Sequence, residues 1–143
     1  MKKKVVSIVG ARPNFIKLAA LHTYLKKSFS HIIIHTGQHY DYELSQSFFD
    51  EFSIPAPNYN LQVNSRGHNE QIKLITSKCE EILINEKPDL VIVYGDTNST
   101  VGGAEASKRV NIPVAHIEAG IRSFSKNLPE EKNRILVDKI SNI

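Results

Sequence analysis

Short β-branched runs that alternate with longer helical stretches constrain this chain more than any other feature. Residues 4–10, 31–36, 90–94 and 113–117 are rich in valine, isoleucine or both. The stretches between them carry apolar residues at helical spacing. Strands that alternate with helices of this length form parallel sheets with both faces covered. We therefore predict an α/β fold, a Rossmann-like doubly wound parallel sheet.

The helices expected from this pattern fill most of the remaining chain. They run from Pro13 to about Leu25 and over residues 42–52, 69–86, 97 or 98–109 and 129–143, and residues 59–63 form a short extended piece. The helical stretch at residues 129–143 has no capping residue, glycine or strand after it. We therefore expect residues 1–143 to be the N-terminal domain of a longer protein whose C-terminal domain is absent here.

Composition excludes several classes of protein. The 143 residues carry a net charge of +3, and the basic residues at the start are not interleaved with aromatic ones, so we expect no nucleic-acid partner. No apolar stretch is long enough for a membrane span and no signal peptide is present, which indicates a cytoplasmic protein without membrane contact. The single cysteine, Cys79, falls on an apolar helical stripe and is expected in the core.

Two strands end at a carboxylate, at the edge where open α/β sheets hold their ligands. Asp96 follows the strand at 90–94, and Glu118 follows the strand at 113–117. Asp96 could instead cap the next helix, and Glu118 needs a partner such as Arg122 or Arg12. His116 is either a hydrogen-bonded core residue or a metal ligand, and we expect no metal site because no third ligand has suitable spacing.

The first strand-to-helix turn has one glycine, Gly10, where a dinucleotide fingerprint needs three, so we expect no NAD or FAD. Arg12 and Lys17 at the following helix start suit an anionic group such as a phosphate. The alternative is that Arg12 pairs with an acid across the sheet and Lys17 faces solvent. Glu130 and Glu131 open the last helix, where a favourable interaction with the helix dipole is a sufficient explanation for both.

Five ordered blocks resemble those of the non-hydrolysing UDP-N-acetylglucosamine 2-epimerases. They are residues 10–17, 35–40, 94–100, 116–124 and 128–134. The resemblance extends from one end of the chain to the other. It implies the N-terminal half of a GT-B fold, in which a nucleotide sugar lies in the cleft between two Rossmann-like domains, and a homodimer when the protein is full-length.

The same resemblance implies a reaction and a set of site residues. The family interconverts UDP-N-acetylglucosamine and UDP-N-acetylmannosamine by elimination and re-addition of UDP, without NAD or an essential metal, for cell-surface polysaccharide precursors. Asp96, Glu118 and Glu130 match its catalytic carboxylates. The residues that match its substrate contacts are Arg12, Lys17, Gln38, His39, Asn98 and Arg122.

Other functions stay open at this stage. Asn14 and Phe15 in the first block look more like the branch that acts on UDP-2,3-diacetamido-2,3-dideoxyglucuronate. A GT-B glycosyltransferase domain would need a general base but not three acids. A non-catalytic nucleotide-sugar-binding domain would use the acids only as caps and salt-bridge partners.

Overall fold

A computed structural model describes residues 1–38, 47, 50–63, 67–125 and 127–143. Its centre is a five-stranded sheet in the order β3-β2-β1-β4-β5, and every pair of neighbouring strands is parallel. The strands are β1 (Lys4–Val9), β2 (Ser30–His35), β3 (Tyr59–Asn60), β4 (Leu90–Tyr94) and β5 (Val114–Ile117). The order steps outward from β1 in both directions, which places a topological switch point between β1 and β4.

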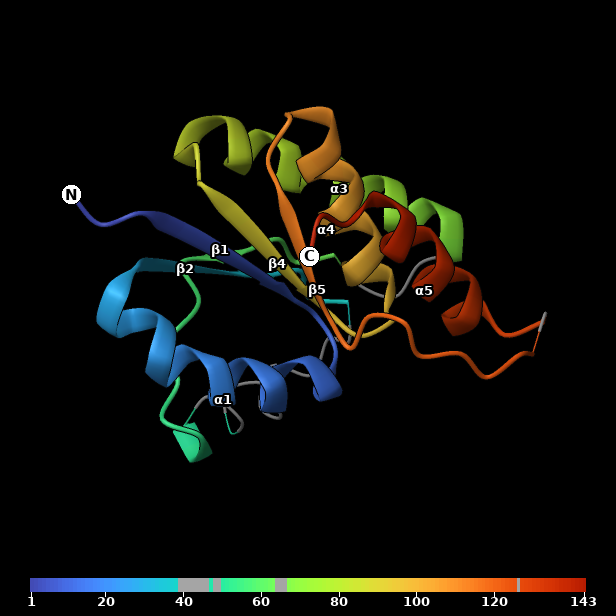
Figure 1. The fold of residues 1–143 in the computed structure, drawn as a ribbon, viewed down its shortest axis with the longest axis horizontal. Helices are drawn as coiled ribbons and strands as arrows, with labels where there is room; N and C mark the ends of the chain where they lie inside the picture. The colour runs from blue at the N-terminus through green and yellow to red at the C-terminus, as the bar shows by residue number, and fades with distance from the viewer. Residues whose placement is uncertain (39–46, 48–49, 64–66, 126) are drawn as a thin grey trace.

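Helices cover both faces of this sheet. Figure 1 shows α1 (Arg12–Ser28) on one face and α3 (His68–Glu86), α4 (Asn98–Arg109) and α5 (Pro129–Ile140) on the other. The predicted α/β doubly wound architecture is therefore confirmed. The helix predicted over residues 42–52 lies largely outside the described residues.

Alternation along the strands divides the core into two apolar layers. Val5 and Val9 of β1 face α1, where they pack with Phe15 and Leu18. Val6 and Ile8 of β1 pack on the opposite side with residues of α3 and α4, including the predicted core residue Cys79. Cys79 is completely buried, and this burial raises the pKa of its thiol to about 12, so the thiolate that would react is disfavoured.

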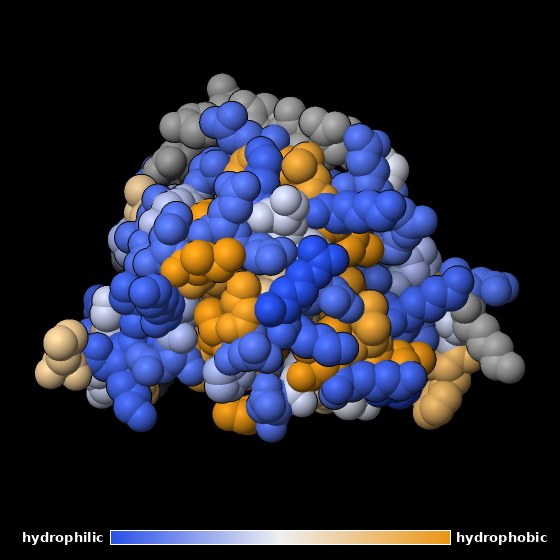
Figure 2. Space-filling view, turned by 90° about the horizontal axis from the view of Figure 1, so that it is seen from above, coloured by the Kyte–Doolittle hydropathy of each residue, from blue (hydrophilic) through white to orange (hydrophobic). Residues whose placement is uncertain are grey.

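A glycine lets α3 and α4 approach each other closely. A Cβ added to Gly102 would lie 2.4 Å from Cγ2 of Ile75, far inside contact distance. Figure 2 looks down on this side of the molecule and shows separate apolar groups among hydrophilic residues. Close packing therefore holds α3 against α4, and the surface above them mixes apolar and hydrophilic residues (Figure 2).

The chain after α5 differs from the prediction. The helix was expected to continue to Ile143 but ends at Ile140, and Ile143 is extended beside β5. The N–H of Ile143 donates to the carbonyl of Val114 at 3.2 Å, and the N–H of His116 donates to the carbonyl of Ile143 at 2.9 Å. These two hydrogen bonds have the pattern of a parallel bridge. Pairing with backbone groups of β5 that would otherwise lack a partner therefore outweighs the tendency of the last residues to continue the helix.

No described helix combines the length and the apolar composition that crossing a membrane requires.

Candidate active site

The carboxyl ends of β1, β4 and β5 bring three connecting segments together. Lys17, in the second turn of α1, forms an ion pair with Glu118, which follows β5, and Nζ lies 2.8 Å from Oε1. Gly95, in the turn after β4, lies against both, since an added Cβ would be 3.4 Å from Lys17 Nζ and 3.9 Å from Glu118 Oε2. Residues distant in the sequence therefore meet at one point, as the sequence predicted for this edge.

Glu118 differs from its expected setting in two ways. Its ion-pair partner is Lys17 rather than Arg122 or Arg12, and the side chain is 42% exposed rather than buried. Its backbone has a φ of 71°, in the left-handed region that non-glycine residues seldom occupy. The chain reverses sharply at this residue, which directs the carboxylate toward α1 instead of into the sheet.

Asp96 is an ion-pair partner and not a helix cap. Arg134 of α5 contacts its carboxylate, and Asn133 donates to its backbone carbonyl at 2.9 Å. The cap of α4 is Thr97, whose side chain accepts a hydrogen bond from the N–H of Thr100. The capping alternative for Asp96 is therefore wrong, and its carboxylate is left for a contact between elements.

The two acids that open α5 have different environments. Glu130 is exposed and precedes Arg134 by four residues, so both side chains lie on one face of the helix. Glu131 is buried and accepts hydrogen bonds from the side-chain hydroxyl and the backbone N–H of Ser123, at 2.6 and 2.7 Å. These two bonds and the guanidinium of Arg134 lower the pKa of Glu131. Glu131 therefore holds the segment before α5, whereas Glu130 remains available.

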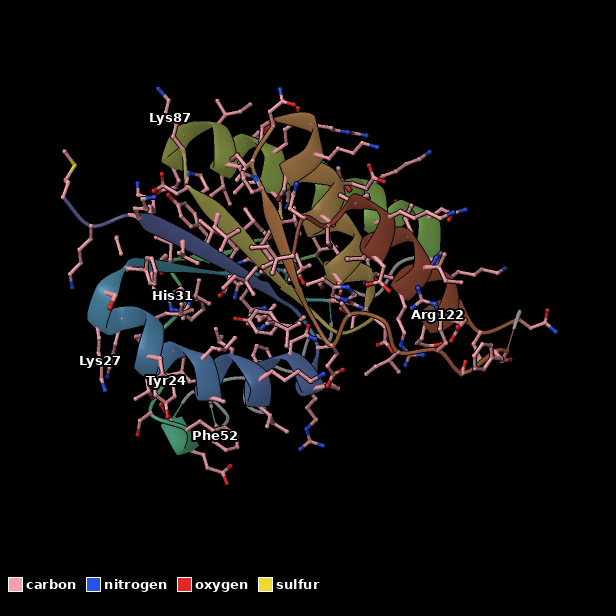
Figure 3. All side chains as sticks on the ribbon, in the orientation of Figure 1. Tyr24, Lys27, His31, Phe52, Lys87 and Arg122 are labelled. Atoms are coloured by element: carbon pink, nitrogen blue, oxygen red, sulfur yellow. The ribbon has the colours of Figure 1, made fainter. Side chains whose placement is uncertain are left out.

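A buried network connects β5 to α5. His116 contacts Asp138 through Nδ1 and the carbonyl of Gly95 through Nε2, both at 2.6 Å. Arg122 donates to the other oxygen of Asp138 at 2.8 Å, and Figure 3 shows Arg122 beside α5. Burial opposes ionisation of Asp138, but hydrogen bonds from Arg122, the N–H of Gly120 and His116 outweigh it and lower the pKa of Asp138.

The ring of His116 is thus a satisfied core histidine and not a free base. A backbone carbonyl can only accept a hydrogen bond, so Nε2 donates to Gly95. Nδ1 lies 2.6 Å from a carboxylate oxygen of Asp138, so both ring nitrogens are engaged within the fold. Among the described residues, no group of three or more His, Cys, Asp or Glu side chains is placed to hold a metal ion.

The start of α1 is less open to an anion than the sequence suggested. The side-chain oxygen of Asn14 accepts from the N–H groups of Gly10 and Ala11 at 3.1 and 3.2 Å, and its amide group donates to the carbonyl of Tyr94. The N–H group of Ala11, which caps α1, and that of Gly10 before it are therefore occupied. Arg12 is exposed and Lys17 is partly exposed, so both present positive charge at this helix start.

Gln38 and Asn98 bond to other parts of the same edge. Gln38 accepts from the backbone N–H and hydroxyl of Ser99 at 2.9 and 2.5 Å, which satisfies a donor at the start of α4. Asn98 donates to Gln71 at 2.7 Å and accepts from Asn133 at 3.3 Å. His39 lies outside the described residues.

Sequence reasoning missed several residues of this arrangement. It selected Lys17, Asp96 and Glu118, which the structure brings to one edge, but not the residues that fix them, namely Asn14, Asn133, Arg134 and Asp138. The spacing of Glu130, Arg134 and Asp138 at intervals of four residues was an available signal, because such residues share a helix face. Chemically, the edge presents acids beside fixed cations, which suits proton transfer on an anionic substrate.

Comparison with known proteins places this chain among sugar-nucleotide epimerases. A family model described as UDP-N-acetylglucosamine 2-epimerase matches residues 23–143. A UDP-N-acetylglucosamine 2-epimerase homolog of Methanococcus maripaludis is 59% identical over 98% of this chain and 39% of its own length. The UDP-2,3-diacetamido-2,3-dideoxy-D-glucuronate 2-epimerase of Pseudomonas aeruginosa is 44% identical over 98% of this chain and 40% of its own length.

A solved structure agrees with this chain in fold. The UDP-N-acetylglucosamine 2-epimerase of Methanocaldococcus jannaschii, in complex with UDP-N-acetylglucosamine and UDP, matches with a TM-score of 0.91 and 44% identity over 99% of this chain. The match covers 39% of that structure, so the chain spans about two fifths of the length of such relatives. The family match covers most of the chain. The chain belongs to the UDP-N-acetylglucosamine 2-epimerase family.

Proposed function

We propose that the protein containing this chain interconverts UDP-N-acetylglucosamine and UDP-N-acetylmannosamine, supplying precursors of cell-surface polysaccharides in the cytoplasm. Support comes from the family match and from relatives named for this reaction. In this proposal, the chain is the N-terminal half of a GT-B enzyme that acts as a homodimer. In the same proposal, a second domain forms the other wall of the substrate cleft, and the coverage of only 39% of a relative's length supports it.

The observation that carries the proposal is the set of acids beside fixed cations at one edge of the sheet. Asp96 lies against Arg134, and Glu118 lies against Lys17. Epimerisation requires removal of the hydrogen on C2 of the sugar, and a carboxylate is a suitable base. The C1–oxygen bond to UDP breaks as a C1–C2 double bond forms, and UDP re-adds after a proton is delivered to the other face of C2.

The cations have a matching role in this reaction. Expulsion of UDP develops negative charge on the diphosphate, which a fixed guanidinium or ammonium stabilises more in the transition state than in the ground state. We assign this role to Arg12 and Lys17, and the proton transfers to Asp96, Glu118 and Glu130. Gln38, His39, Asn98 and Arg122 complete the proposed substrate contacts, and Arg122 reaches its position through Asp138.

A hydrogen-exchange experiment tests this proposal. The full-length protein is incubated with UDP-N-acetylglucosamine in deuterated water, and the sugar is followed by NMR. We expect deuterium at C2 and the appearance of UDP-N-acetylmannosamine. Transfer of the sugar to an acceptor without exchange would indicate a glycosyltransferase instead, and binding without either reaction would indicate a nucleotide-sugar-binding domain. Both results would overturn the proposal.

The Pseudomonas relative favours a second candidate substrate, UDP-2,3-diacetamido-2,3-dideoxyglucuronate. The mechanism at C1 and C2 would be the same, because the two sugars differ at C3 and at the carboxylate that replaces the C6 hydroxymethyl group. The same exchange experiment with both sugars decides between them through the ratio of their kcat/KM values.

A further inference from the structure

Glu118 has a conformation that its own contacts do not explain. Its φ of 71° is unfavourable for a residue with a side chain, and such conformations persist when the surrounding structure holds them. Its carboxylate is partly exposed and bonded to the flexible side chain of Lys17. The position of this acid must therefore be set by the backbone on either side of it.

Asp138 of α5 contacts residues on both sides of Glu118. One carboxylate oxygen lies 2.6 Å from Nδ1 of His116, two residues before Glu118. The other accepts from the N–H of Gly120 at 3.0 Å and from Arg122 at 2.8 Å, two and four residues after it. One side chain thus spans the reversal at Glu118.

The same network reaches the second acid. His116 donates to the carbonyl of Gly95, the residue before Asp96. Arg134, one helical turn before Asp138, pairs with the carboxylate of Asp96. Glu130, Arg134 and Asp138 recur every four residues, so one face of α5 carries all three. The position of α5 is therefore coupled to the positions of the three proposed acids, which are Asp96, Glu118 and Glu130.

We propose that Asp138 is a positioning residue for the epimerisation, holding Glu118 and the turn of Asp96 in their reactive arrangement through His116, Gly120 and Arg122. This inference rests on the proposed function. Asp138 itself does not contact substrate in this scheme. Its carboxylate is used within the network, where it pairs with Arg122 and bonds to His116.

Two substitutions separate the contributions of shape and charge. Asp138→Asn keeps the size of the side chain, since its amide oxygen can accept from Gly120 and Arg122 while its NH2 group donates to a neutral His116. Asp138→Ala removes every contact. The matched control is Asp89→Asn. Asp89 is also a carboxylate that accepts a hydrogen bond from a backbone N–H, that of Lys4 at 2.8 Å. It precedes β4, however, and so lies at the opposite end of the strands from the proposed acids.

In the full-length protein, we expect Asp138→Ala to lower kcat for C2 exchange by about 100-fold, with a smaller rise in KM through Arg122, because small misplacements of catalytic groups have effects of this size. Asp138→Asn should recover at least about tenfold of that loss, and Asp89→Asn should match the unsubstituted protein. A kcat for Asp138→Ala within twofold of the unsubstituted protein would overturn the inference. The inference would also be overturned if kcat and the folded fraction of the protein fell together in both Asp138 variants.

A crystal structure of the full-length Asp138→Asn variant and, where it folds, of Asp138→Ala separates this inference from the proposed function. We expect residues 118–122 to shift in Asp138→Ala and to stay near their original positions in Asp138→Asn. If the unsubstituted protein shows no exchange, the proposed function fails. The positioning role is then judged by the structures alone, and an unmoved Glu118 in Asp138→Ala, or failure of both variants to fold, would refute it.

Discussion

At the scale of single residues, two of the three proposed acids are paired with cations that come from other elements. Lys17 comes from α1 and Arg134 from α5, while Glu118 and Asp96 follow β5 and β4. An ion pair of this kind fixes the direction of a carboxylate. In the proposed reaction, Lys17 also places positive charge beside the leaving diphosphate.

Replacing Asp96 with Asn should suppress exchange at C2 far more than it affects folding. The amide cannot take a proton, and loss of a general acid–base group lowers rates by about 100-fold or more. The pair with Arg134 is partly exposed, so the free energy of unfolding should fall by only about 1 kcal/mol. Exchange measured by NMR and unfolding measured in urea check the two halves of this prediction.

Glu80→Gln is the matched control for that experiment. Glu80 also pairs with an arginine, Arg109 at 3.4 Å, but the pair joins α3 and α4 on the surface away from the acids. This variant should exchange C2 hydrogen at the unsubstituted rate. Full activity of Asp96→Asn would remove Asp96 from the proposed chemistry.

Three histidines on the α1 side of the sheet are built into the fold as neutral rings. Nδ1 of His22 lies 2.9 Å from Nδ1 of His31, whose other nitrogen bonds to Ser7, and Figure 3 shows His31 between the sheet and α1. Hydrogen bonding between two ring nitrogens requires one of them to be unprotonated. Nδ1 of His35 accepts from the N–H of Gly37, which also requires a bare nitrogen.

Stability should therefore fall as the pH is lowered from 7 to 5. Burial lowers the pKa of His31 and the pKa of His35 to about 4, and the neighbouring His22 adds to the effect on His31. In the unfolded chain, the same groups titrate near 6.5. Protons therefore bind the unfolded chain first, and each ring should cost about 2 kcal/mol of stability by pH 5.

Urea unfolding at several pH values measures this loss, in a range where the carboxylates stay ionised. His31→Gln should flatten the curve by roughly half, because one of the two strongly shifted groups is gone. A free energy of unfolding that stays constant between pH 7 and pH 5 would contradict this account of the histidines.

At the scale of elements, α5 combines a structural face with the face that carries the acid. Glu131 and Val137 are buried, while Glu130 is exposed in the same first turn. The sequence explained both glutamates by the helix dipole, which acts on them alike. The family resemblance singled out Glu130. The packing of the segment around Ser123 gives the physical difference, because that segment supplies two hydrogen bonds to Glu131 and none to Glu130 among the described contacts.

Substituting these neighbouring acids should give opposite results. Glu130→Gln should lower the rate of C2 exchange by about 100-fold while the free energy of unfolding stays within about 0.5 kcal/mol, as for exposed surface changes. Glu131→Gln should lower the free energy of unfolding by about 1–3 kcal/mol, because a charge-assisted acceptor of two hydrogen bonds is weakened. Paired exchange and urea measurements on the two variants provide the test. Equal effects of the two substitutions on activity and on stability would show that the two acids do not differ in role.

At the scale of the whole molecule, the proposed site occupies one edge of a chain that spans about two fifths of the length of its relatives. The matching structure of the relative was solved with UDP-N-acetylglucosamine and UDP. A nucleotide sugar is bound mainly by enclosure between surfaces, and the acids described above lie on an exposed edge.

Residues 1–143 expressed alone should therefore show no C2 exchange above background, whereas the full-length protein should be active. The chain alone would lack contacts that hold the UDP group, so productive binding should be weaker by several orders of magnitude. Exchange in deuterated water at equal protein concentrations compares the two forms, with circular dichroism to verify that the short form is folded. Full activity of the short form would show that no facing domain is needed.

The sequence alone determined the sheet, the helices on its faces, the edge at which the acids lie and the family. These follow from hydrophobic periodicity and from motifs that are contiguous in the chain. Tertiary structure alone decided that Lys17 pairs with Glu118, that Thr97 rather than Asp96 caps α4, that the last residues pair with β5, and that Asp138 spans the turn at Glu118. The partner of a charged side chain depends on which strands and helices become neighbours in space, and local spacing in the sequence does not determine those neighbours.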